Sequence, residues 1–304
     1  MKASNISRDR GYPQKHMNGT EELLSRAHGL LDRLDRLLPG RDAEPPQRDD
    51  LAWRWQVHGF ARSLAPVKKI TGIRLDDLQC IDRQKEEIIR NTRQFLCKLP
   101  ANHVLLWGPR GTGKSSLIKA LLNEYGPAGL RLIEVEKQHL TDLALITEQV
   151  QGLAQRFIIY CDDLSFDAND PSYRAIKVII DGSVSATPEN VLIYATSNRR
   201  HLLPEYMNEN LQGRMVEGEL HQSEAVEEKI SLSERFGLWL AFHPFNQEQY
   251  LSIVDYWISS LRAPKGNRDD MHAAALQWAL EHGSRSGRSA WQFARDWTGR
   301  RRLK

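Results

Sequence analysis

The stretch G-P-R-G-T-G-K-S, from Gly108 to Ser115, decides the fold of this chain. It fits the pattern G-x-x-x-x-G-K-[ST] and lies between an apolar run, HVLLW at 103–107, and a helical pattern, KSSLIKALL at 114–122. A strand, a glycine-rich turn and a helix in this order form the setting in which backbone amides wrap a phosphate. The alternative is a glycine turn with a surface lysine, and the flanking strand and helix disfavour it.

Each part of this loop has an expected role. The glycines let the backbone approach phosphate closely, Lys114 reaches the β and γ oxygens, and Ser115 offers Mg²⁺ a hydroxyl. The expected nucleotide contacts are Gly108, Pro109, Arg110, Gly111, Thr112, Gly113, Lys114, Ser115 and Ser116.

Two aspartates follow a second apolar run, in RFIIYCDDL at 156–164. Ligands of open α/β sheets collect at the carboxyl ends of strands, where Asp162 and Asp163 are expected. We expect Asp162 to hold Mg²⁺ together with Ser115, and Asp163 to orient or deprotonate an attacking water. Adjacent aspartates alone are more often a solvated turn. A phosphate-binding loop upstream favours the metal site.

A third run, NVLIYATSN at 190–198, ends in the small polar residues Thr196, Ser197 and Asn198. If this strand lies beside the strand before the loop, these groups can hold a water against the terminal phosphate. A merely hydrophilic strand end is the other interpretation, and the segment alone does not exclude it.

Short apolar runs alternate with helical patterns from residue 103 to residue 242. The strand-like runs are HVLLW, LRLIEV, RFIIYC, NVLIYAT and LWLAF, and continuous apolar character is typical of strands covered on both faces. The alternation predicts βαβ units and a parallel sheet, hence an α/β core over residues 51–244. From residue 245 to 304 only helical patterns follow, which predicts a small all-α domain.

The first fifty residues predict a separate extension. Leu23, Leu24, Ala27, Leu30, Leu31, Leu34 and Leu38 recur at helical spacing, and the polar stretch RDAEPPQRDD at 41–50 resembles a linker. The leucine-rich face could dock on the core, on a neighbouring subunit or on a client.

Composition sets broad limits on partners. The 304 residues carry 42 Lys and Arg against 39 Asp and Glu, a net charge of +3, which permits nucleic acid without indicating it. Apolar runs are too short to cross a bilayer, and the start lacks an apolar leader, so we expect a cytoplasmic protein with no membrane partner. Three scattered cysteines predict reduced thiols rather than disulfides or a metal site.

The order GPRGTGKS, FIIYCDD, YATSN, SLSERF and SGRSAWQF resembles the Walker A, Walker B, sensor 1, arginine finger and sensor 2 motifs of AAA+ ATPases. More narrowly, the last 250 residues or so resemble an uncharacterised bacterial family of AAA+ ATP-binding proteins. The resemblance implies a doubly wound parallel sheet, with the P-loop strand beside the sensor strand and a helical lid. It also implies ATP with Mg²⁺ and a homo-oligomeric ring or filament.

The resemblance assigns further residues. Arg235, before LWLAF, would reach the γ-phosphate of a neighbouring subunit, with Arg199 and Arg200 as alternatives. Arg288 would contact ATP from the lid, with Arg285 as its competitor. Adenine would lie near Asp77, Leu78 and Ile81, which could equally be core packing.

Two residues depart from the AAA+ pattern. Asp163 stands where most AAA+ ATPases have glutamate, and Cys80 stands where the matching stretch usually has glycine. The shorter carboxylate predicts slow turnover.

The leading hypothesis is an AAA+ ATPase that couples Mg-ATP hydrolysis to conformational work on a protein partner. Two alternatives remain: a nucleic-acid loader or initiator-like ATPase, and a non-hydrolysing ATP-dependent switch. The only clear basic patch is the terminal GRRRLK, for which a solvated end is the simpler interpretation.

Overall fold

The computed structural model describes residues 23, 26–29, 50–59, 61–166, 170–181, 188–199, 202, 214–216, 219–221, 234–264 and 266–303. Residues 45–55 and 64–304 form one compact unit, and residues 1–44 with 56–63 form another. The N-terminal helix that the sequence predicts lies almost wholly outside the described residues, although Leu23 and residues 26–29 are helical.

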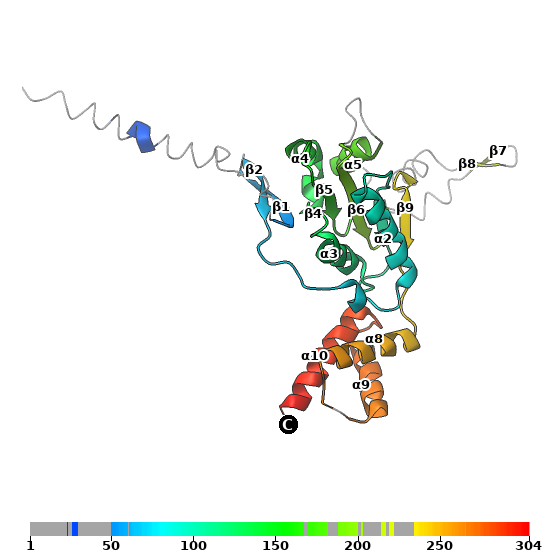
Figure 1. Ribbon diagram of the computed structural model, residues 1–304. Coiled ribbons are helices and arrows are strands. Elements are labelled where there is room, and N and C mark those ends of the chain that lie inside the picture. Colours follow the sequence, from blue (N-terminus) through cyan, green and yellow to red (C-terminus); the bar gives the residue numbers. More distant parts are fainter. Residues whose placement is uncertain are drawn as a thin grey trace, which may run out of the picture. The chain divides into compact units, whose positions relative to one another are not determined.

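A seven-stranded sheet forms the centre of the fold (Figure 1). Its strands are β1 Ala52–His58, β2 Ala61–Pro66, β3 Val104–Trp107, β4 Leu130–Glu134, β5 Arg156–Cys161, β6 Val191–Ser197 and β9 Leu238–Ala241. The spatial order is β2-β1-β4-β5-β6-β3-β9, and every pairing from β1 to β9 is parallel. This confirms the predicted parallel sheet, with the P-loop strand β3 next to the sensor strand β6.

The central strands are as buried as their sequences predict. All residues of β5 and of β6 are buried, because helices cover both faces of the sheet. In Figure 1, α2 (Asp82–Leu96) and α3 (Lys114–Tyr125) lie together in front of the sheet. The helices α4 (Leu143–Val150) and α5 (Pro171–Asp181) contact each other and the short 3-10 segment η2 (Lys137–Asp142).

Strands β1 and β2 were not predicted from the sequence. β1 pairs with β4 so that Arg54 faces Glu134, and its Nη2 lies 2.7 Å from a carboxylate oxygen. Trp53 and Trp55 are buried, and the Trp55 indole donates to Asp142 at 3.0 Å. The alternation W-R-W-Q is typical of a strand with one solvent-exposed face, and a search for continuous apolar runs misses such a strand. The short antiparallel pair β7 (Arg214–Val216) and β8 (Glu219–His221) was also missed.

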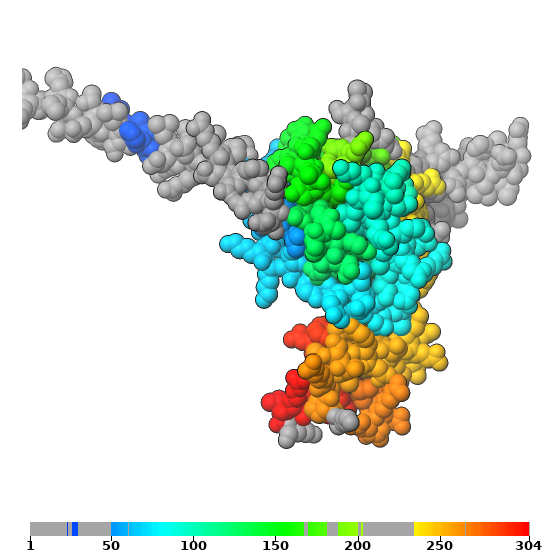
Figure 2. Space-filling view, in the orientation of Figure 1, coloured from blue at the N-terminus to red at the C-terminus, as the bar shows by residue number. Residues whose placement is uncertain are grey.

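Three helices form the C-terminal lid: α8 Gln247–Ser260, α9 Arg268–Glu281 and α10 Gly287–Arg302. Each begins at a side-chain cap, with Asn246, Asn267 and Ser286 accepting from backbone N–H groups of the first turn. The lid contacts the core near η1 (Leu75–Asp77), where the Tyr256 hydroxyl donates to Asp77 at 2.6 Å. Figure 2 shows the orange and red lid atoms against the cyan part of the core.

None of the helices in the described part of the chain combines the length and the apolarity needed to span a bilayer.

Candidate functional site

The loop between β3 and α3 depends on its glycines. Gly108, Gly111 and Gly113 have φ of 136°, 78° and 102°, which residues with a Cβ rarely adopt. A Cβ on Gly108 would lie 2.1 Å from the carbonyl oxygen of Phe242, at the end of β9. The loop therefore passes directly over the neighbouring chain, and only glycine fits.

Lys114 lies at the first position of α3, with its ammonium turned back into the loop. Nζ donates to the carbonyl oxygens of Gly108 at 2.6 Å and Pro109 at 2.7 Å, and to Asn198 Oδ1 at 3.3 Å. Burial lowers the pKa of Lys114, while the charges of Asp162 and Asp163 act in the opposite direction. The side chain is a buried cation whose three donors all point to the carboxyl ends of β3 and β6.

Asp162 joins the loop helix to two strands. Its Oδ1 accepts from Ser115 Oγ at 2.7 Å and from the hydroxyl of Thr196. Burial acts to raise the pKa of Asp162, but hydrogen bonds from Thr196, Ser115 and Tyr160 outweigh it, so the pKa is lowered. The carboxylate stays ionised at neutral pH.

Asp163 adopts a left-handed conformation, with φ of 52°. Its backbone N–H donates to the Thr196 hydroxyl at 2.9 Å. Its carboxylate accepts from the Asn198 amide on one oxygen and from Arg110 on the other, at 3.3 Å. Asn198 therefore bridges Asp163 and Lys114.

The oxygen donors around Asp162 fit Mg²⁺. Ser115 and Asp162 offer a hydroxyl and a carboxylate, which are hard ligands that Mg²⁺ prefers. The Tyr160 hydroxyl is buried beside them and contributes to lowering the pKa of Asp162. No group of three or more His, Cys, Asp or Glu residues in the described ranges could hold a metal alone. Mg²⁺ in phosphate-binding sites commonly takes its other ligands from phosphate and water.

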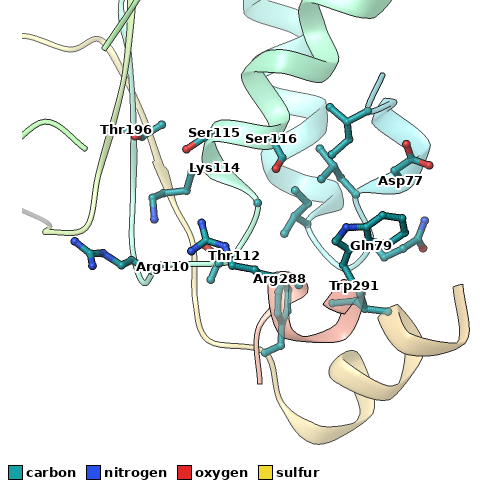
Figure 3. Close-up of a pocket in the computed structure, with 18 of the residues that line it drawn as sticks. Asp77, Gln79, Arg110, Thr112, Lys114, Ser115, Ser116, Thr196, Arg288 and Trp291 are labelled. Carbon is teal, nitrogen blue, oxygen red and sulfur yellow. The ribbon is translucent and has the colours of Figure 1, made fainter. Parts of the chain in front are cut away.

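These groups line one cavity of about 750 Å³ between the sheet edge and the lid (Figure 3). On the lid side, Arg288 and Trp291 extend from α10 toward the loop and toward Gln79. The backbone N–H of Gly287 donates to the carbonyl of Gly111 at 2.9 Å. The lid thus contacts the phosphate-binding loop directly.

The cavity brings together most residues that the sequence singled out. Its walls include Arg110, Gly111, Thr112, Gly113, Lys114, Ser115, Ser116, Asp162, Asp163, Asn198 and Arg288, with Asp77, Leu78 and Ile81 on the other side. Gly108 and Pro109 reach it through their carbonyl contacts with Lys114.

The arginines proposed to act between subunits lie elsewhere. Arg199 follows β6 outside the cavity lining, and Arg200 lies outside the described residues. Arg235 precedes β9, whose first residue Leu238 faces the first residue of β3, Val104. Arg235 is therefore at the sheet edge opposite the loop. Arg285 also lies outside the described lining.

Sequence reasoning missed three features of the site. Thr196 was expected to face a phosphate-bound water, but its hydroxyl holds Asp162 and Asp163 together. Trp107, directly before the loop, is half-buried and meets His243 edge-on, with ring centroids 6.5 Å apart. Trp291 was not singled out as a site residue, although its place three residues after Arg288 puts both on one helical face.

The family model described as "Protein of unknown function (DUF815)" matches residues 48–301. The chain belongs to this family. The match begins just before β1 and runs into the last turn of α10, so β1, β2 and the lid are part of what the family shares. No curated protein matches the sequence.

Two groups of solved structures resemble the chain. The Thermotoga maritima RuvB Holliday junction branch migration motor is 15% identical, with a TM-score of 0.47 over 73% of this chain and 63% of its own. The FIGL-1 AAA domain in complex with ADP is 17% identical, with a TM-score of 0.48 over 74% of this chain and 72% of its own. The chain thus spans less than two thirds of the RuvB length. Its own strand order, P-loop and helical lid are those of an AAA+ P-loop NTPase fold.

Proposed function

We propose that this protein binds ATP with Mg²⁺, hydrolyses it, and couples turnover to conformational work on a protein partner. One observation carries the proposal: a buried lysine, a serine–aspartate pair and a second aspartate converge on a single cavity beneath a glycine loop. Packing alone does not require a lysine and two aspartates at one sheet edge, whereas a site for a magnesium-bound triphosphate does.

Lys114 supplies the cation for the terminal phosphates. In the structure its ammonium donates to two loop carbonyls and to Asn198, so phosphate oxygens would replace acceptors that already lie in place. Ser115 and Asp162 would hold Mg²⁺, which neutralises charge on the β- and γ-phosphates when bound.

Asp163 and Asn198 would handle the attacking water. Asn198, directly after β6, donates to one carboxylate oxygen of Asp163. The position of the base therefore depends on β6. Because Asp163 also pairs with Arg110 on the loop, we expect that pairing to weaken when phosphate attracts the guanidinium. The carboxylate then accepts the proton of the water.

Arg288 would link the lid to the nucleotide. It lies in the first turn of α10, directly after the residue whose N–H bonds to Gly111. A γ-phosphate that attracts Arg288 therefore pulls on the helix joined to the loop.

We assign residues 51–244 to the nucleotide-binding core, residues 245–304 to the lid and residues 1–50 to an extension.

Arg235 would act on a neighbouring subunit in a homo-oligomer. It precedes β9, and β9 alone has four residues, a length of about 13 Å that separates Arg235 from the loop edge. An arginine side chain does not span this distance and the loop as well. If Arg235 assists hydrolysis, it does so on another copy of the chain.

Lys114→Ala tests the proposal. It should abolish Mg-ATP hydrolysis and weaken ATP binding, because it removes the buried cation. Lys69→Ala is the matched control, since Lys69 is exposed and lies outside the cavity. Parent-like hydrolysis by Lys114→Ala would contradict the assignment of the loop.

A non-hydrolysing switch is the second candidate, favoured by the restraint on Asp163. Asn198 and Arg110 both engage its short carboxylate. Tight ATP binding without multiple turnover would support the switch, and phosphate release over many turnovers would exclude it. The basic residues at the end of α10 do not point to a nucleic-acid partner, because they already have protein partners. Arg302 donates to the carbonyl oxygen of Leu261, and Arg300 pairs with Asp296.

A further inference from the structure

The cavity has two chemically different ends. Lys114 lies at one end and Trp291 at the other (Figure 3). Asp162 and Asp163 belong to the Lys114 end, because they bond to Ser115 and Asn198. The second end is lined by aromatic and aliphatic side chains from the lid, among them Phe245, Ile253 and Trp257. A ligand with an anionic tail and a flat apolar head matches such a cavity.

Two tryptophans form the wall of the apolar end. Trp257 on α8 and Trp291 on α10 have ring centroids 4.4 Å apart, with an angle of 57° between the rings. Both are only partly buried, whereas Trp53 and Trp55 are 2% and 1% exposed in the core. Trp257 and Trp291 both line the cavity.

One face of α10 serves both ends of the cavity. Arg288 lies beside the loop, since a Cβ on Gly111 would lie 3.5 Å from the Arg288 Cβ. Trp291 follows three residues later, one turn and about 4.5 Å along the helix. Its indole extends toward Gln79, on the segment that carries Asp77 and Leu78 (Figure 3).

We propose that Trp291 is the base-binding residue of this site and that it selects purine nucleotides by stacking. The inference rests on the proposed nucleotide-binding function. A two-ring base covers more of an indole than a one-ring base does, and stacking energy follows the shared area. The Trp291 ring packs against Trp257, and the Arg295 guanidinium carbon lies 5.8 Å from its centroid.

Calorimetry with three magnesium-bound ligands tests this inference: ADP, CDP and tripolyphosphate, which has no base. The parent should bind ADP more tightly than CDP. Trp291→Ala should weaken ADP binding by about 10- to 100-fold and leave tripolyphosphate binding unchanged. Trp291→Phe, which keeps an aromatic ring, should recover part of the ADP affinity.

Trp297→Ala is the matched control. Trp297 also lies on α10, with Arg301 over its ring at 4.7 Å, but it is not among the described residues that line the cavity. The control should bind ADP like the parent. If Trp297→Ala weakens ADP as much as Trp291→Ala does, loss of lid packing explains both and the inference falls.

Two other results would overturn the inference while leaving the proposed function intact. Unchanged ADP binding by Trp291→Ala would show that the indole does not touch the base. Equal losses for ADP and tripolyphosphate would show that Trp291 only positions the lid. Failure of the proposed function looks different, because the parent would then bind none of the three ligands, and the base-binding role would fall with it.

Discussion

Replacing Thr196 by valine isolates one hydroxyl that holds both aspartates of the site. The Thr196 side chain is 1% exposed, donates to Asp162 and accepts from the backbone N–H of Asp163 at 2.9 Å. Valine has nearly the same shape, so the substitution removes two hydrogen bonds without opening a cavity.

The magnitude follows from the solvation of the two partners. A hydrogen bond to a charged group contributes about 1.5–3 kcal/mol, and Asp162 is open to solvent, so water replaces part of it and the lower value applies. The partly buried N–H of Asp163 loses its acceptor at a cost of about 1 kcal/mol. We expect the free energy of unfolding to fall by about 2–3 kcal/mol at pH 7.

The pH dependence gives a second readout. The pKa of Asp162 is lowered in the folded protein, so its contribution to stability is present above the unfolded pKa and is lost as pH falls through the folded one. Thr196→Val removes a donor and raises the pKa of Asp162. The stability difference between parent and variant should therefore shrink in acid.

Denaturant unfolding at pH 7 and in acid measures both effects, with Thr196→Ser as the control that keeps the hydroxyl. In a Mg²⁺ titration of ATP hydrolysis, only the valine variant should need a higher Mg²⁺ concentration than the parent for half-maximal activity. A valine variant as stable as the parent at pH 7, with the same Mg²⁺ dependence, would refute the role of Thr196.

Two further predictions concern Cys80 and Arg235. Cys80 has φ of 62°, so Cys80→Gly should be about 1 kcal/mol more stable toward denaturant than Cys80→Ala, which keeps the strained backbone; equal stabilities would contradict this. Arg235→Ala should keep ATP affinity but lose turnover, and mixing it with Asp163→Asn should restore hydrolysis if Arg235 acts on a neighbouring subunit. Loss of ATP binding by Arg235→Ala would instead indicate a structural role.

The sequence predicted the parts of the fold whose patterns are local. The glycine loop, the apolar strands and the lid helices each lie within about fifteen residues, and the βαβ alternation predicted the parallel pairing of the strands. Cys80 also belongs here, because the resemblance places glycine at its position and its φ of 62° is the conformation that glycine favours.

The remaining features depend on contacts between distant segments. The bridge from Lys114 through Asn198 to Asp163 joins three elements, and no spacing in the sequence specifies it. β1 was missed because polar residues on its solvent-exposed face interrupt the apolar run. Trp291 could be recognised as a cavity residue only once α10 was seen to lie across the loop.

Isothermal titration of the folded protein with ATP in the presence of Mg²⁺ tests the central claim most directly. The account predicts saturable binding of one nucleotide per chain that Lys114→Ala abolishes or strongly weakens and Lys69→Ala leaves intact. Folded parent protein that takes up neither ATP nor ADP would contradict it.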